Sequence, residues 1–362
     1  MHCAIDGNEA NVEHKVGVSW YVYKLLQQFA KIASKNDSFT IFLREKPRED
    51  MPEESTYFHY AIVPGKNVWS QVFLPLALYT QYRTIDVFFS PAHYAPRFCP
   101  VPLVVALHDL SYFYYPSDFL KSDLYKLEHW TRYSVKRATH VIAVSQTTKK
   151  DAIRQYNLKD DKITVVPNGF EPPGMQLTTL PSFSHYFAYI GTLQPRKNLE
   201  TLLHAFSNVH AKYPQYTLRI IGKKGWMFDH VFRIIESLKL TNSVLFTGYV
   251  DEQEKYSVIT NATALIVPGL YEGFGLPMLE AFHTKTPVIA ANSGALPEIG
   301  KDVATYFELI DHVDLSEKMI DVIEHGKVKI QIARAYELVK EYTWELTARR
   351  ILTILKKATY FH

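Results

Sequence analysis

The most informative part of the chain is Glu272-Gly273-Phe274-Gly275-Leu276-Pro277-Met278-Leu279-Glu280, where two carboxylates flank a glycine-rich turn that leads into a helix. Pro277 suits the first helical position, because its missing N–H would have no partner there in any case. The backbone amides of Gly275 to Met278 are then expected to point out of the helix N-terminus, where an anion such as a phosphate is favoured. We expect the two glutamates to bind a hydroxyl-rich group, such as a ribose or a hexose.

The residues on either side of this turn indicate a parallel sheet. The apolar runs 264–268 and 287–290 are typical of buried parallel strands. The turn therefore follows the carboxyl end of a strand, where open α/β sheets bind their ligands. Taken singly, Glu272 and Glu280 are more simply interpreted as a solvated loop acid and a first-turn helix acid. It is the complete string that favours a binding site.

Strands alternate with helices along the whole chain, which predicts doubly wound parallel sheets. Predicted strands lie at 4–5, 39–43, 87–89, 103–107, 141–144, 163–166, 186–190, 218–221, 244–246, 265–267 and 288–290, with helices at 20–33 and 119–138 in the first half. Prolines and glycines gather at 167–181, which we interpret as a linker between two domains.

Composition excludes several classes of protein. The chain has 362 residues with 47% hydrophobic and 21% charged residues, which is globular rather than disordered. A net charge of +3 gives no reason to expect a nucleic-acid partner. Only Cys3 and Cys99 are present, which argues against a disulfide framework. No apolar run approaches the roughly 18 residues of a spanning helix, and the first residues do not have the pattern of a signal peptide, so we expect a cytoplasmic protein.

The stretch 272–280, together with 287–290 and 294–298, resembles the Glu-x7-Glu signature of retaining glycosyltransferases of family four. That family has the GT-B fold, so the resemblance implies two Rossmann-like domains that face a central cleft. Residues 1–170 would bind the acceptor and residues 171–344 the nucleotide-sugar donor, while a final helix at about 345–362 would pack back on the first domain. By the same resemblance, Glu280 holds the ribose and Glu272 contacts sugar hydroxyls near the reacting carbon.

A second loop of the donor domain, residues 191–199, carries further expected site residues. In the resembling family this loop supplies cations that neutralise the diphosphate leaving group, and Lys197 occupies the family lysine position. In that family an arginine usually follows the glycine directly, but in this chain Thr192 follows Gly191. Arg196 could supply the lost charge, because arginine binds phosphate through its forked guanidinium. The alternative for Arg196 is an exposed position at the start of a helix.

The first domain contributes His108, directly after the predicted strand 103–107. The resemblance places this histidine beside the donor sugar, and the alternative is a histidine bonded within a turn. Gly17 matches the glycine-containing loop after the first strand of the family, a loop that approaches the donor phosphates and the acceptor. Its alternative is a plain turn.

The resemblance implies a retaining, metal-independent transferase of a hexose that needs no cofactor besides its nucleotide-sugar donor. No Asp-x-Asp pair lies in a suitable loop. The loop 191–199 is similar to that of bacterial mannosyltransferases of polysaccharide assembly, which suggests GDP-mannose as donor. The expected acceptor is a glycan or a lipid-linked sugar in cell-surface polysaccharide synthesis, with peripheral contact at the inner membrane face as an open alternative.

Three other interpretations stay open or are weakened by the sequence. A nicotinamide-binding Rossmann protein needs a Gly-x-Gly-x-x-Gly turn after its first strand, and residues 6–10 do not provide one. A sugar-nucleotide epimerase or a phosphorylase shares the two-domain architecture, although a phosphorylase is usually much longer. A catalytically silent GT-B domain that only binds a partner is the third, and the presence of Glu272, His108 and Lys197 argues against it.

Overall fold

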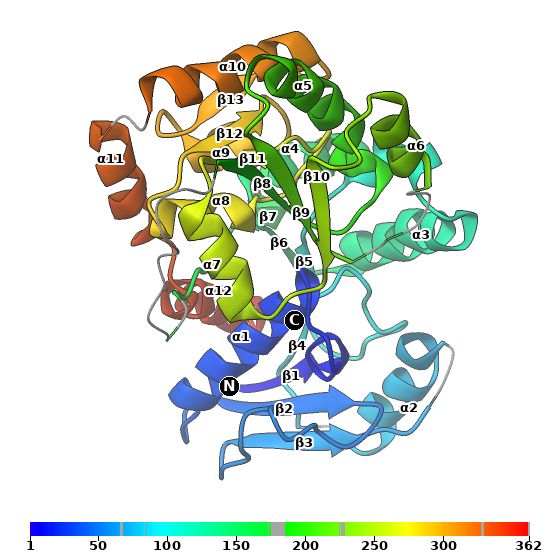
Figure 1. Ribbon diagram of the computed structural model, residues 1–362. Helices are drawn as coiled ribbons and strands as arrows, with labels where there is room; N and C mark the ends of the chain where they lie inside the picture. Colours follow the sequence, from blue (N-terminus) through cyan, green and yellow to red (C-terminus); the bar gives the residue numbers. More distant parts are fainter. Residues whose placement is uncertain are drawn as a thin grey trace. The chain divides into compact units, whose positions relative to one another are not determined.

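A computed structural model describes residues 1–65, 68–82, 84–172, 174, 185–223, 225, 229–326 and 329–360. The chain forms two compact units (Figure 1). Unit 1 comprises Met1–Gly169 and Tyr342–His362, and unit 2 comprises Phe170–Glu341. Within the described residues each unit is built on one parallel sheet, so the predicted α/β class is confirmed.

Over the described part of unit 1, the sheet has seven strands in the order β3-β2-β1-β4-β5-β6-β7. The strands are β1 (His2–Asp6), β2 (Ser38–Leu43), β3 (Phe58–Ile62), β4 (Val87–Ser90), β5 (Leu103–Leu107), β6 (His140–Ala143) and β7 (Ile163–Val165). From β1 the chain builds the sheet outward in one direction to β3, and from β4 it builds in the other direction. The boundary between β1 and β4 is thus the topological switch point of this sheet.

The helices of unit 1 are α1 (Val18–Ile32), α2 (Phe73–Thr80), α3 (Lys121–Arg137), α4 (Gln146–Tyr156) and α12 (Trp344–Ala358). α1 buries Tyr21, Leu25 and Phe29, which recur every four residues and so lie on one face of the helix. α4 begins at a side-chain cap, where the Ser145 hydroxyl accepts from the amide of Thr148 at 3.0 Å. These contacts position the loops that precede α1 and α4.

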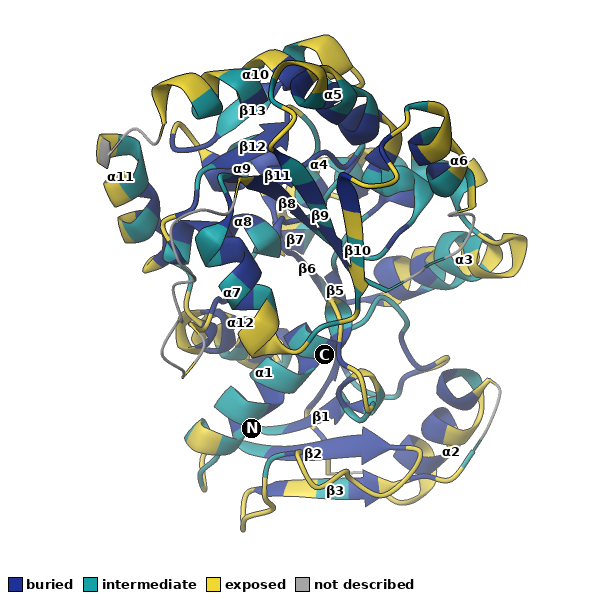
Figure 2. Cartoon of the chain, viewed as in Figure 1, coloured by how far each residue is buried: buried dark blue, intermediate teal, exposed yellow. Residues whose placement is uncertain are grey.

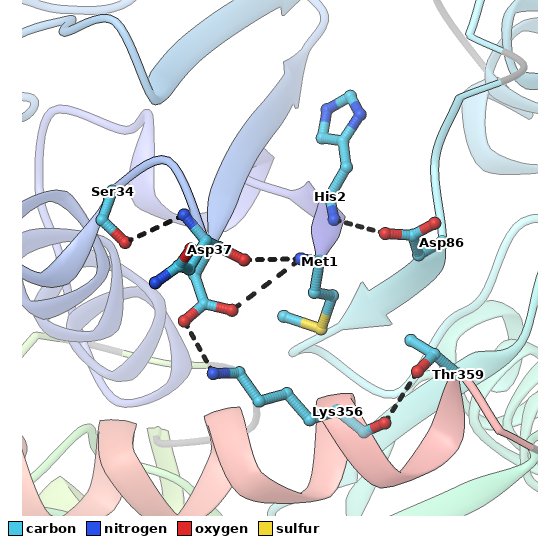
Figure 3. A network of polar contacts seen from close by, with 8 residues as sticks. Met1, His2, Ser34, Asp37, Asp86, Lys356 and Thr359 are labelled. Carbon is cyan, nitrogen blue, oxygen red and sulfur yellow. Dashed lines mark hydrogen bonds and ion pairs between the residues drawn. The ribbon is translucent and has the colours of Figure 1, made fainter.

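The last helix, α12, belongs to unit 1 although it follows unit 2 in the sequence. It buries Trp344, Ile351 and Leu355. At its other end the Lys356 ammonium lies 2.7 Å from the carboxylate of Asp37, which is also 4.0 Å from the amino group of Met1 (Figure 3). An apolar face and an ion pair therefore both hold this helix on unit 1.

Over the described part of unit 2, the sheet has six strands in the order β10-β9-β8-β11-β12-β13. They are β8 (Tyr186–Ile190), β9 (Thr217–Ile221), β10 (Val244–Gly248), β11 (Ala264–Val267), β12 (Val288–Ala291) and β13 (Thr305–Phe307). The helices are α5 (Leu199–Lys212), α6 (Asp229–Ser237), α7 (Glu252–Asn261), α8 (Leu276–His283), α9 (Leu296–Gly300), α10 (His312–His325) and α11 (Lys329–Val339). The switch point of this sheet lies between β8 and β11.

Burial follows from strand composition. Every residue of β11 and β12 is buried, as expected for apolar strands covered on both faces of a parallel sheet (Figure 2). Outer helices such as α10 expose their polar faces instead. Among the described residues, none of the helices combines the length and the apolar character needed to cross a membrane.

Candidate active site

Two loops meet at the switch point of unit 2. One follows β8 and carries Lys197, and the other follows β11 and carries Glu272. β8 and β11 are neighbours in the sheet, so the loops that leave their carboxyl ends are also neighbours. The Lys197 ammonium lies 2.5 Å from the Glu272 carboxylate, with side-chain exposures of 18% and 15%. The structure thus brings together two of the residues predicted from the sequence.

The segment after β12 fixes the backbone of Glu272. The amide of Ala295 donates to the carbonyl oxygen of Glu272 at 2.8 Å. Gly294 has φ +54°, and a Cβ atom there would lie 2.5 Å from the same oxygen, so only glycine fits this approach. The Ser293 hydroxyl donates to the carbonyl oxygen of Gly269 at 2.7 Å. The family resemblance included this segment, but sequence reasoning gave it no role in holding Glu272.

Hydrogen bonds also join the two loops directly. The amide of Leu270 donates to the carbonyl oxygen of Arg196 at 2.8 Å. The Arg196 guanidinium donates in turn to the carbonyl oxygen of Tyr271 at 3.3 Å. The Asn198 side chain donates to the carbonyl oxygen of Pro268 at 3.1 Å. Arg196 is therefore packed against the loop that carries Glu272, rather than standing in water at the start of a helix.

Thr192 lies earlier in the loop after β8. Its carbonyl oxygen accepts from the hydroxyl of Tyr189 at 3.4 Å. The next amide, that of Leu193, donates to the carbonyl oxygen of Lys223 at 3.0 Å, which ties the loop to the end of β9. Thr192 thus has a fixed backbone, and the positive charge of the usual arginine is absent from this position.

The glycine-rich turn begins α8 one residue earlier than predicted. Gly275 is the N-cap with φ +104°, a left-handed conformation that favours glycine, and Leu276 is the first helical residue. Pro277 is therefore second, and the prediction that it opens the helix is wrong. The amide of Met278 donates to the carbonyl oxygen of Gly275 at 3.0 Å, so this amide does not point outward as predicted. That contact tightens the turn and leaves the amides of Gly275 and Leu276 as the candidates for an anion.

The other two residues of the turn lie between Glu272 and the N-cap. Phe274 is buried, at 4% exposure, and anchors the turn in the core of unit 2. Gly273 precedes it directly. The turn is thus fixed by an apolar side chain on one side and by the capped helix on the other.

Glu280 lies in the second turn of α8 and forms an ion pair that the sequence did not predict. Its carboxylate is 2.8 Å from the Lys255 ammonium of α7, which is also 2.8 Å from Glu252. Burial raises the pKa of Glu280, and Lys255 opposes that rise. Burial also lowers the pKa of Lys255, but the carboxylates of Glu280 and Glu252 outweigh it and the net pKa is raised. No spacing signal could have revealed this pair, because the partners lie on different helices.

In unit 1, His108 follows β5 and its surroundings hold it in the neutral form. Its Nε2 atom donates to the carbonyl oxygen of Pro91 at 2.7 Å. Its ring packs edge-on against Tyr21, with centroids 4.5 Å apart. Burial lowers the pKa of His108 to about 4. The neighbouring Asp109 accepts from the amide of Ser111 at 2.9 Å and thus closes the turn after β5.

Two further residues lie in loops at the switch point of unit 1. Gly17, in the loop after β1, is the N-cap of α1 and has φ +48°. His93 lies after β4, with its ring centroid 5.4 Å from that of His108. Sequence reasoning named Gly17 and His108 but passed over His93. Among the described residues, no three His, Cys, Asp or Glu side chains gather in a way that could hold a metal ion.

Comparison with known families identifies the protein class. Residues 16–172 match the family model described as "Glycosyltransferase Family 4", and residues 178–338 match "Glycosyl transferases group 1". The chain belongs to family four of the glycosyltransferases.

Relatives of this glycosyltransferase include proteins that are named O-antigen chain mannosyltransferases. It is 26% identical to O-antigen chain mannosyltransferase B of Escherichia coli over 88% of this chain and 85% of that protein. It is 28% identical to O-antigen chain mannosyltransferase RfbU of Salmonella typhimurium, over 56% of this chain and 55% of the relative.

Solved structures confirm that the glycosyltransferase has the GT-B fold. Sucrose-phosphate synthase from Thermosynechococcus elongatus superposes with a TM-score of 0.78 at 17% identity, over 100% of both chains. HepE from Anabaena, solved in complex with UDP and glucose, superposes with a TM-score of 0.75 at 16% identity, over 98% of this chain and 99% of that one. At these identities the likeness concerns the fold alone.

Proposed function

We propose that this glycosyltransferase moves a hexose, with mannose as the first candidate, from a nucleotide-diphosphate sugar to a glycan acceptor. The transfer retains the anomeric configuration and needs no divalent ion. The observation that carries the proposal is the contact of Lys197 with Glu272 at the switch point of unit 2. At this point of the sheet, a cation that can bind the leaving group, Lys197, lies beside a carboxylate that can bind the sugar, Glu272.

The proposed reaction follows from the charges of these loops. As the bond between the anomeric carbon and the diphosphate oxygen breaks, negative charge grows on the leaving group. Lys197, Arg196 and the amides at the start of α8 stabilise that charge, as fixed donors do in other enzymes. The acceptor hydroxyl attacks the anomeric carbon from the face that the diphosphate leaves. Its proton passes to the departing phosphate oxygen.

The remaining residues have binding roles in this proposal. Glu280 accepts hydrogen bonds from the ribose hydroxyls of the nucleotide, and Lys255 opposes the rise in its pKa that burial causes. Glu272 accepts from sugar hydroxyls near the reacting carbon. A covalent role for Glu272 is less favoured, because its ion pair with Lys197 reduces its nucleophilicity. Neutral His108 contacts the donor sugar, and the loop of Gly17 approaches the phosphates.

The names of the relatives support mannose and a polysaccharide acceptor, which is either a free glycan or a lipid-linked one. The nucleobase of the donor is less constrained. The complex of HepE contains UDP, whereas the resemblance in loop 191–199 favours GDP. No cofactor besides the donor is included in the proposal.

The test is nucleoside diphosphate release from GDP-mannose, UDP-glucose and ADP-glucose, with and without short mannose oligosaccharides as acceptor probes. We expect release that depends on the acceptor, is fastest with GDP-mannose and persists in EDTA. NMR of the product should show the anomeric configuration of the donor. Turnover that vanishes with EDTA and returns with manganese would contradict metal independence. A donor that stabilises the protein in thermal shift but is never consumed would point to a silent binding domain.

A further inference from the structure

His93 lies at the switch point of unit 1 in an unfavourable conformation. It follows β4, which neighbours β1 and β5 in the sheet. Its backbone has φ +61°, a left-handed value that is uncommon for residues other than glycine. Its Nδ1 atom is buried and, among the described residues, has no hydrogen-bond partner. Strained backbone and unsatisfied buried polar atoms are both rare, and both concentrate where a ligand binds.

Hydrogen bonds fix the loop that carries this ring. The amide of His93 donates to the carbonyl oxygen of Ala106 at 3.2 Å. The Ser90 hydroxyl donates to the carbonyl oxygen of Tyr94. The Ser134 hydroxyl of α3 accepts from the amide of Ala95 at 2.8 Å. The left-handed residue is therefore held on both sides, so its backbone is positioned before any ligand arrives.

His93 and His108 form a pair of neutral rings. Burial and the proximity of His108 both lower the pKa of His93. Nε2 of His108 donates to the carbonyl oxygen of Pro91 at 2.7 Å, which fixes the orientation of the second ring. Uncharged imidazole nitrogens suit an uncharged hydroxyl, whereas a phosphate forms its strongest hydrogen bonds with cations.

The hydroxyl of Tyr21 provides a useful contrast. It too is buried without a partner among the described residues, and its ring contacts His108. Tyr21, however, is enclosed at 1% exposure. His93 is half-buried as a residue, and a turn about its Cβ–Cγ bond exchanges the positions of Nδ1 and Cδ2 without moving the backbone. Of these two residues, His93 is therefore the one that can present its unpaired polar atom to a ligand.

We infer that Nδ1 of His93 hydrogen-bonds a hydroxyl of a sugar bound by this enzyme, and that His93 helps to select that sugar, a role that rests on the transferase activity proposed above. The loop after β4 corresponds in its sheet to the loop after β11, which carries Glu272. Both follow the strand at which the sheet changes direction, where α/β sheets bind ligands. The hydroxyl belongs either to the donor hexose or to the acceptor, and kinetics separate the two.

The experiment compares three variants with the wild-type enzyme. His93→Gly removes the ring and relieves the left-handed backbone. His93→Asn tolerates that backbone and restores an amide group near the position of Nδ1. Asn157→Gly is the matched control, because Asn157 is exposed in the same unit and has φ +55°. We expect His93→Gly to lower kcat/KM by about 10-fold or more, as for loss of one hydrogen bond to a substrate that leaves a partner unpaired. His93→Asn should recover most of the loss, and Asn157→Gly should match the wild type.

Two arms identify the source of the hydroxyl. A raised KM for GDP-mannose at saturating mannose oligosaccharide assigns it to the donor, and a raised KM for the oligosaccharide at saturating GDP-mannose assigns it to the acceptor. Affinity for GDP alone should be the same in every variant. Nitrogen-15 NMR of the imidazoles reports binding without turnover, and the His93 resonances should shift when GDP-mannose or the oligosaccharide is added to the wild type but not when GDP is added.

Two results would overturn this role. The first is an active wild-type enzyme whose kcat/KM is unchanged in the His93→Gly variant. The second is a His93→Asn variant that loses as much kcat/KM as His93→Gly does. A wild-type enzyme that turns over no donor would instead remove the proposed function. In that case unshifted His93 resonances with both sugars would remove the role of His93 as well.

Discussion

The two units share a topology but differ in the chemistry at their switch points. In unit 2 the loops after β8 and β11 carry the ion pair of Lys197 with Glu272, and helices α7 and α8 carry the ion pair of Lys255 with Glu280. In unit 1 the loops after β4 and β5 carry the neutral rings of His93 and His108. One architecture therefore presents charge in one copy and uncharged hydrogen-bonding groups in the other.

The difference matches the two kinds of group in the proposed substrates. In the proposal, cations bind the diphosphate, carboxylates accept from hydroxyls of the ribose and the hexose, and neutral imidazoles bind further sugar hydroxyls. The ion pairs of unit 2 also keep its charged groups satisfied when no ligand is present, because a partly buried charge without a partner is costly. If this contrast is correct, charge-removing substitutions in unit 2 should have larger effects than changes that affect the neutral rings of unit 1.

The largest effect is expected for Lys197→Ala. It removes the cation proposed to stabilise the leaving diphosphate, so kcat should fall by roughly 100-fold to 1,000-fold, as when one preorganised donor is lost elsewhere. Steady-state nucleoside diphosphate release measures it. Lys212→Ala is the matched control, because Lys212 is an exposed lysine of α5 paired with Glu324. A Lys197→Ala enzyme with unchanged kcat would remove the cation role from unit 2.

A smaller effect is expected for Glu280→Ala, on nucleotide binding rather than on chemistry. Loss of a charged acceptor of ribose hydroxyls should weaken GDP affinity by about 10-fold to 100-fold. Isothermal calorimetry with GDP measures it. Glu252→Gln serves as control, because Glu252 also pairs with Lys255 but leaves the Glu280 carboxylate intact. Equal losses in both variants would mean that Lys255, and not Glu280, carries the binding.

A third prediction uses pH to sharpen the contrast. The pKa of His108 is lowered from 6.5 to about 4 in the folded protein, so the unfolded chain binds more protons between these values. The stability from neutral His108 is complete above pH 6.5 and is lost as the pH falls toward about 4. Between pH 6.5 and about 5, this amounts to about 2 kcal/mol.

The measurement is thermal unfolding across that pH range, for the wild type and His108→Asn. The wild type should lose more stability on acidification than the variant does. His325→Gln is the control, since His325 is exposed on α10. Parallel curves for the wild type and His108→Asn would show that the neutral form of His108 is not favoured by folding.

The sequence predicted the fold better than it predicted the surroundings of the site. The expected strands 103–107 and 186–190 coincide with β5 and β8, because a parallel strand buried on both faces is a continuous apolar run. β3 was missed because it is an edge strand that exposes His59 and Ile62. β13, at three residues, is too short to show any period.

The site shows the same limit. The Glu-x7-Glu string is contiguous, so its residues could be named from the sequence, and their roles stay predictions. The pairs Lys255–Glu280 and His93–His108 could not be found in this way, because each depends on which helices or strands are neighbours in space. A motif therefore shows where a site lies, but not which side chains from other elements complete it.

The smallest effect is expected where the end of the chain returns to unit 1. Lys356→Met keeps the aliphatic stem but removes the ion pair of Lys356 with Asp37. The side chain of Lys356 is 46% exposed and that of Asp37 is 11% exposed. Because one partner is well solvated, the loss should be only about 0.5 to 1 kcal/mol of unfolding free energy. Thermal unfolding at low salt measures it, with Lys357→Met as control at the next exposed position of α12.

This variant also separates the two units. Unit 2 is a continuous segment, whereas unit 1 needs the returning helix, so Lys356→Met should lower the melting temperature without changing GDP affinity. The loss should shrink at high salt, because salt screens an exposed charge. An unchanged melting temperature at low salt would mean that the apolar face of Trp344, Ile351 and Leu355 holds α12 unaided. Weaker GDP binding would mean that the tail of unit 1 influences the charged loops of unit 2, and the two switch points could then no longer be treated as independent.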